Sequence, residues 1–86
     1  MSEPVAVATV TLNPVNEEQL NDIFTYHAPD AVQLVQYAAV REAAKAFART
    51  VIEHVPPSAD RTAALRKVRE AVMTANAAIA LRGKNF

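Results

Sequence analysis

The placement of helix breakers is the feature that most constrains this chain. It has one Gly, at position 83, and five Pro residues, of which Pro56 and Pro57 are adjacent. No Gly or Pro interrupts residues 31–54 or residues 58–82, so each stretch is free to form one continuous helix. At about 1.5 Å per residue, the first helix forms a rod of roughly 36 Å. The sequence therefore predicts an all-α fold, a long antiparallel hairpin of two helices joined at a Pro-Pro turn.

Capping residues predict where the helices begin. Asn16, followed by two Glu residues and a Gln, predicts a short helix over about 17–25. Residues 5–12 are apolar and loosely alternating, which is typical of a short strand or a flexible arm. We expect an N-terminal arm over residues 1–15 and a helical hairpin domain over residues 16–86.

The two long helices have their own start and stop signals. Asp30, with Gln33 three residues later, is typical of a capping box that starts the first helix. Ser58 or Asp60 caps the second helix, which we expect to run to Arg82. Gly83 then stands where the residue after a helix end adopts a left-handed conformation.

Both long helices carry more apolar residues than one hairpin can bury. On each, apolar residues repeat at intervals of three and four, and we expect these two stripes to face each other. The stripes are Tyr37, Val40, Ala44, Phe47 and Val51 on the first helix, and Leu65, Val68, Val72, Ala75 and Ile79 on the second. Further apolar residues off the stripes include Leu34 and Ile52. A second apolar face on so small a protein predicts a homo-oligomer of stacked hairpins.

The net charge of zero conceals an uneven distribution. Residues 1–30 carry five acids and no base, whereas residues 31–86 carry nine bases and four acids. Such a basic region suits anionic ligands such as phosphates, although a solvated basic surface has the same composition. There is no Cys and no segment typical of a membrane span or signal peptide, so we expect a soluble cytoplasmic protein with no membrane partner.

Catalytic and metal-binding patterns are weak. The chain has only two His residues, His27 and His54, with a long helix between them, and a single Gly cannot build a phosphate-binding loop. We expect no enzymatic activity and no cofactor, and binding through side chains and helix ends.

The clearest binding pattern is a row of cations on the first long helix. Arg41, Lys45 and Arg49 recur every four residues and so share one face, about 6 Å apart per step. The row is either a solvated face, paired with Glu42 and Glu53, or a phosphate-binding surface. The cations of the second long helix are interpreted as surface residues: Arg61, Arg66, Lys67 and Arg69.

Four further residues are candidates for ligand binding. Tyr26 and His27 precede a helix start, where an anion is favoured and an exposed ring could stack on a base; alternatively, Tyr26 packs on the core and His27 caps a turn. Arg82 ends the last helix, where the dipole favours a cation in any case. Asn76 lies in an Ala-rich stretch and needs a partner from backbone, another subunit or a ligand.

Three motifs together resemble a known family. They are YHAP at 26–29, QYAAVREAAKAFA at 36–48 and PPSADRTAALRKVREAVMTANAAIA at 56–80. Over roughly residues 17–82 the chain resembles the phage-encoded sponge proteins that inhibit bacterial CBASS immunity. These share a hairpin domain with the sponges that inhibit Thoeris immunity.

The resemblance implies a mechanism and roles for individual residues. Family members form oligomers, typically hexamers, that bind cyclic dinucleotides such as cGAMP between protomers without cleaving them, and several also bind cyclic trinucleotides. By position, Tyr26 corresponds to a residue that stacks on a base, Arg41 to a phosphate contact, and Arg82 to a contact of the trinucleotide site. Ala43 stands where some members carry a hydroxyl. The resemblance places such a protein in the host bacterial cytoplasm, where it would block CBASS signalling.

Two other functions remain open at this stage. The ligand could instead be a cyclic ADP-ribose isomer of Thoeris signalling, which also carries adenine and phosphates. A helical oligomer that binds protein or nucleic acid would have the same basic face, although DNA is not the partner we expect.

Overall fold

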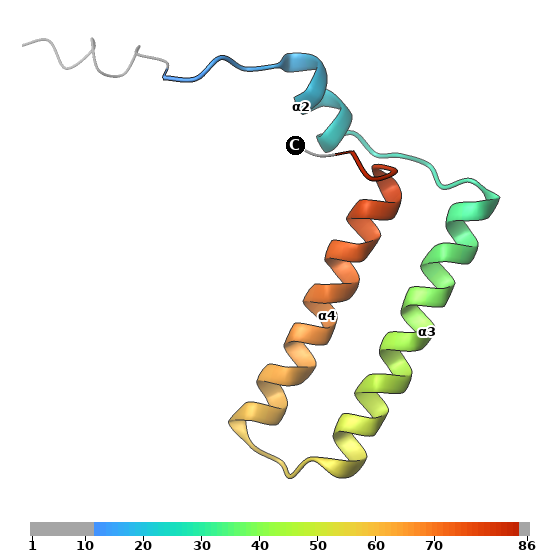
Figure 1. The fold of residues 1–86 in the computed structure, drawn as a ribbon, viewed down its shortest axis with the longest axis vertical. Coiled ribbons are helices and arrows are strands. Elements are labelled where there is room, and N and C mark those ends of the chain that lie inside the picture. The colour runs from blue at the N-terminus through green and yellow to red at the C-terminus, as the bar shows by residue number, and fades with distance from the viewer. Residues whose placement is uncertain (1–11, 85–86) are drawn as a thin grey trace, which may run out of the picture.

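The computed structural model describes residues 12–84, which form three helices and no strand (Figure 1). Helix α2 spans Glu17–Phe24, α3 spans Ala31–His54 and α4 spans Ala59–Ala80. Helices α3 and α4 lie side by side as an antiparallel hairpin, and α2 lies beyond its open end (Figure 1). The predicted all-α hairpin with a short preceding helix is confirmed. The strand or arm expected over residues 5–12 lies almost wholly outside the described residues.

The three predicted N-caps are present. Each cap side chain accepts a hydrogen bond from the backbone N–H three residues on, Asn16 at 2.9 Å, Asp30 at 2.8 Å and Ser58 at 3.1 Å. The side chain of Gln33 accepts in return from the N–H of Asp30 at 3.0 Å, which completes the capping box. These bonds satisfy donors that have no partner within their own helix.

Helix α4 ends two residues earlier than the sequence predicts, at Ala80. The N–H of Gly83 donates to the carbonyl of Ala78 at 2.9 Å, and the N–H of Arg82 donates to that of Ile79 at 3.1 Å. This pair of bonds is the Schellman arrangement. Leu81 is the C-cap, so Arg82 rather than Gly83 is the first residue after the cap. Both are left-handed, with φ of 51° at Arg82 and 77° at Gly83. For a residue with a Cβ this conformation costs on the order of 1 kcal/mol.

The interior between α3 and α4 is thin. Val51, 8% exposed, is the one buried apolar residue in the described part of the chain. The other residues of the two predicted stripes are half-buried, except Phe47, which is 57% exposed. Its expected place is taken by Ala48, which is half-buried. At 100° per residue, Ala48 lies about 40° from Ala44 around the helix and Phe47 about 60°, so Ala48 points more directly at α4.

The hairpin is far more extended than an ordinary domain. Its Cα radius of gyration is 20.2 Å, whereas a compact chain of this length has about 12 Å. Several large apolar side chains of the hairpin remain exposed to water: Val32, Leu34, Val35, Phe47, Ile52 and Met73. The part of the predicted second apolar face that Leu34 and Ile52 form is therefore uncovered in a single chain. None of the helices in residues 12–84 has the length and hydropathy of a membrane span.

Candidate functional site

The six predicted binding residues lie in two regions of the hairpin. Tyr26, His27 and Arg82 lie at its open end, and Asn76 lies on α4 one turn from that end. Arg41 and Lys45 lie in the middle of α3. Arg41 is ten residues into α3, about 15 Å along its axis from the open end. Tyr26 and Arg41 of one chain therefore lie at different levels of the hairpin.

The aromatic ring at the open end faces water. Tyr26 lies in the linker between α2 and α3 and is 84% exposed, so the alternative in which it packs on the core is wrong. His27 beside it is half-buried, and its Nε2 forms a short hydrogen bond with the backbone carbonyl of Asp22. The same nitrogen lies 4.0 Å from the Asp22 carboxylate. His27 thus holds the turn after α2, which was its alternative role, while Tyr26 is available for stacking.

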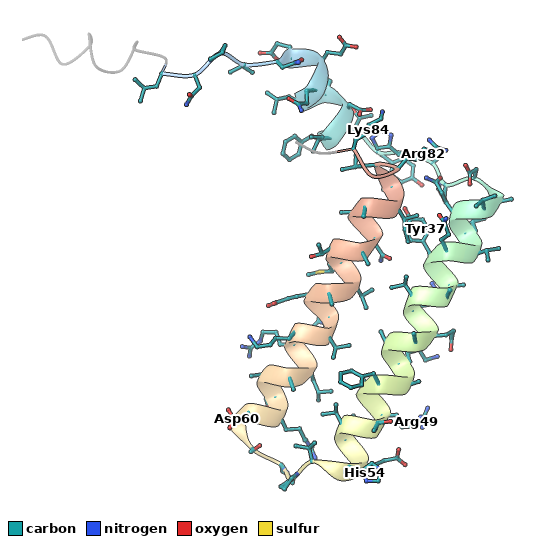
Figure 2. All side chains as sticks on the ribbon, viewed as in Figure 1. Tyr37, Arg49, His54, Asp60, Arg82 and Lys84 are labelled. Atoms are coloured by element: carbon teal, nitrogen blue, oxygen red, sulfur yellow. The ribbon has the colours of Figure 1, made fainter. Side chains whose placement is uncertain are left out.

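Two ion pairs connect the segment after α4 with the N-terminal half of the chain. Arg82 Nη2 donates to Asp30 Oδ2 at 2.8 Å, and Lys84 Nζ donates to Asp22 Oδ2 at 3.0 Å. Figure 2 shows Arg82 and Lys84 together at the open end. The backbone N–H of Gln33 and then the guanidinium of Arg82 lower the pKa of Asp30 below its ordinary value. Arg82 is therefore already engaged by a carboxylate, and a ligand phosphate would compete with Asp30 for it.

Gln33 makes the contact at this end that sequence reasoning missed. It is 5% exposed, and its Nε2 donates to the carbonyl of Ile79 at 2.9 Å, so one side chain completes the cap of α3 and bonds to α4. The capping pattern reveals the first role, but the second depends on the register of the two helices. A cavity of about 450 Å³ lies beside it, with Asp30 and Arg82 among its lining residues.

The middle of the hairpin carries a larger apolar surface with cations at its edge. A groove of about 420 Å³ runs between the helices, here named the α3–α4 groove. Its apolar residues are Ala44, Ala48, Leu65, Val68, Val72 and Met73. Its cations are Arg41 and Lys45 from α3 and Arg69 from α4.

The predicted row of cations divides between two surfaces. Lys45 Nζ lies 3.6 Å from Glu42 Oε1, an exposed ion pair. Arg49 projects from α3 on the side away from α4, where with Lys45 it lines a shallower hollow (Figure 2). Arg41 therefore shares its groove with Lys45 and with Arg69, a residue that sequence reasoning assigned to the surface. Counting residues outward from the Pro-Pro turn in both directions would have revealed this proximity.

Asn76 remains the least explained of the predicted residues. It is half-buried on α4, and its Oδ1 is buried without a hydrogen-bond partner among residues 12–84. An acceptor left without a donor in this way costs about 1–3 kcal/mol. No contact within these residues explains this position on α4. Within the same residues, no cluster of three or more His, Asp or Glu is placed to hold a metal ion.

Comparison with protein families gives one match. A family model described as Acb2/Tad1, hairpin domain, matches residues 16–80, which include α2 and both helices of the hairpin. No curated protein and no solved structure was found to match.

Proposed function

Since the chain belongs to the Acb2/Tad1 hairpin-domain family, we propose that it binds cyclic oligonucleotide second messengers and holds them intact, and so blocks CBASS immunity in the host bacterial cytoplasm. The match confirms the resemblance to the sponge family, and it supports a sponge-type function in general. Cyclic dinucleotides such as cGAMP are the proposed ligands, with cyclic trinucleotides as further ligands. Such a sponge acts by stoichiometry, because it lowers the free concentration of a signal that it does not consume.

The observation that carries this proposal is the separation of two exposed groups. Tyr26 offers a ring to a nucleobase and Arg41 a guanidinium to a phosphate, yet about 15 Å of helix divides them in one chain. We propose that a site containing both takes Tyr26 from one protomer and Arg41 from another. The uncovered apolar face of the hairpin supports such an assembly, which we propose to be a hexamer.

Binding without cleavage agrees with the chemistry of these groups. A guanidinium stays protonated and donates hydrogen bonds to phosphate, and a phenol ring stacks on a base through its face. Neither group supplies a nucleophile or a general base at neutral pH. We therefore propose that the protein is not an enzyme.

The first test is calorimetric titration of the purified protein with a panel of cyclic dinucleotides, cyclic trinucleotides and cyclic ADP-ribose isomers. Any bound ligand is then released by heat denaturation and identified by chromatography. Tight, saturable binding with the ligand recovered unchanged is the expected result. Recovery of cleaved ligand would contradict sequestration. Absence of binding to every ligand of the panel would contradict the proposed function.

Substitutions at the two exposed groups test the assignment of the site. Tyr26→Ala should weaken binding by about 5–150-fold, because stacking on a base contributes about 1–3 kcal/mol. Tyr26→Phe keeps the ring and should bind almost as the wild type does. Arg41→Ala should weaken binding by about tenfold or more, since it removes a charge-assisted hydrogen bond to phosphate. Unchanged binding in both alanine variants would reject this site.

The alternative ligand within the family is a cyclic ADP-ribose isomer. The matched family covers both Acb2 and Tad1. Cyclic ADP-ribose isomers share adenine and phosphates with cyclic oligonucleotides, so Tyr26 and Arg41 could hold either ligand. The panel separates the two classes directly. Affinity that rises with strand length and falls steeply with salt would instead favour a helical oligomer that binds nucleic acid.

A further inference from the structure

The α3–α4 groove has the size and the mixed chemistry of a nucleotide site. Its volume of about 420 Å³ is within the range of pockets that hold small organic ligands. We propose that Arg69 is a ligand-contacting residue that binds the same phosphates as Arg41 from the opposite wall of this groove. The inference rests on the proposed function, since it takes the ligand to be a nucleotide.

Charge is the first argument. Arg41 and Arg69 come from different helices, and neither forms an ion pair with any residue of the described range 12–84. Lys45, the third cation, has only an exposed partner, Glu42, at 3.6 Å. The groove therefore has two cations without a counterion at its edge, and a phosphate supplies the negative charge that this arrangement lacks.

The apolar lining is the second argument. Leu65, Val68 and Val72 are half-buried, and Met73 beside them is 61% exposed. A flat aromatic base can cover such a surface, and the flexible thioether of Met makes favourable contacts with aromatic rings. Inorganic phosphate would satisfy the cations alone, whereas a nucleotide matches both parts of the groove.

A second copy of the chain is the competing occupant of this groove. To cover it, the copy would have to present apolar side chains to the lining and carboxylates to both Arg41 and Arg69, because burying an unpaired guanidinium is costly. A nucleotide meets both demands with one molecule. We therefore assign the groove to the nucleotide.

The experiment compares Arg69→Ala with Arg66→Ala, a matched control one turn away on α4 that does not line the groove. Arg69→Lys keeps the charge and loses the planar fork. Each variant of the full chain is titrated calorimetrically with cGAMP and cyclic di-AMP, and its mass in solution is measured by light scattering.

We expect Arg69→Ala to lose about tenfold or more in affinity, Arg69→Lys to recover part of that loss, and Arg66→Ala to stay within about twofold of the wild type. All should keep the wild-type mass. If Arg69→Ala binds as Arg66→Ala does while the wild type binds tightly, Arg69 is not a contact and only this inference fails. A change of mass in Arg69→Ala would show that Arg69 holds the assembly together and does not act through the ligand, which also overturns it. A wild type that binds neither these probes nor any other member of the panel rejects the proposed function itself.

Discussion

The closed and open ends of the hairpin are held together by different means. At the closed end, Pro56 and Pro57 join the helices through the chain itself, and Val51 is buried nearby. At the open end no peptide bond connects the start of α3 with the end of α4, and polar side chains make the connection instead. Those contacts are Gln33 to the Ile79 carbonyl and Arg82 to Asp30, and a third, Lys84 to Asp22, ties α2 to the same end.

The difference shows where stability and binding compete. The polypeptide itself joins the helices at the closed end, so side-chain contacts are less important for holding them together there. The open end depends on hydrogen bonds that a charged ligand can disturb. Arg82, a predicted ligand contact, belongs to that set because it already binds Asp30. Four substitutions test this comparison, in order of decreasing effect. All are measured by urea unfolding at one protein concentration, since association changes apparent stability.

Gln33→Ala should be the most destabilising. It removes two side-chain hydrogen bonds at a buried position and leaves the N–H of Asp30 without its acceptor, so the free energy of unfolding should fall by about 2–3 kcal/mol. Gln36→Ala, an exposed Gln one turn later, is the matched control and should change it by less than about 0.5 kcal/mol. Equal effects would mean that the amide of Gln33 does not hold the open end.

Ser58→Ala tests the closed end and should have a smaller effect. The hydroxyl of Ser58 accepts from the backbone N–H of Arg61, and loss of such a cap costs about 1 kcal/mol. Ser58→Gly should lower the free energy of unfolding by only a few tenths of a kcal/mol, because Gly is also tolerated at this position. If Ser58→Ala destabilised the protein more than Gln33→Ala, the two ends would have to be ranked the other way.

Asp30→Asn should have a still smaller effect at neutral pH, and its main signature is pH dependence. Because the folded state lowers the pKa of Asp30 below its ordinary value of 3.8, its contribution is fully present above that value and is lost as the pH falls through the folded pKa. The wild type should therefore lose stability below about pH 4. Asn keeps an oxygen for the cap but no charge, so this part of the loss should disappear. Asp60→Asn, on the first turn of α4, is the control; an identical acid profile for both variants would contradict the role of Asp30.

Lys84→Ala should have the smallest effect on unfolding, below about 0.5 kcal/mol, because the ion pair with Asp22 is exposed. Its consequence should be local. Lys84 links the segment after α4 to Asp22 of α2, so the amides of residues 17–24 should exchange faster with solvent in this variant. Lys67→Ala is the control. Unchanged exchange in Lys84→Ala would mean that other contacts hold α2 at the open end.

The sequence predicts this fold well because its signals are local. Breakers and caps act within a few residues, so Asn16, Asp30 and Ser58 mark the helix starts where the structure has them. The predicted end of α4, Arg82, is only two residues beyond the observed end at Ala80. The position of a helix end depends on contacts such as that of Arg82 with Asp30 as well as on the nearby Gly. The exposure of Phe47 was not predicted, because spacing along one helix does not tell which of two neighbouring side chains best faces the other helix.

The candidate site was less predictable because it depends on contacts between helices. Sequence reasoning placed Arg41 and Lys45 on one face, but it took Arg69 for a surface residue because it did not align α3 against α4 across the turn, and the pairing of Asp30 with Arg82 depends on that same alignment. The exposed ring of Tyr26 also required the structure, since position alone left two orientations equally open. Its role in stacking stays a prediction that the titrations test.

The unbroken length of α3 has a consequence for how such a hairpin can change in evolution. Each inserted or deleted residue rotates one side of a helix by about 100° relative to the other, so a single indel between Gln33 and Arg41 would turn the open-end contacts of Gln33 relative to the groove that holds Arg41. Seven residues make nearly two whole turns and leave the facing side chains almost in place. Viable length variants should therefore add or remove seven residues in α3 together with seven in α4, moving the Pro-Pro turn outward or inward while the spacing of the open end stays the same.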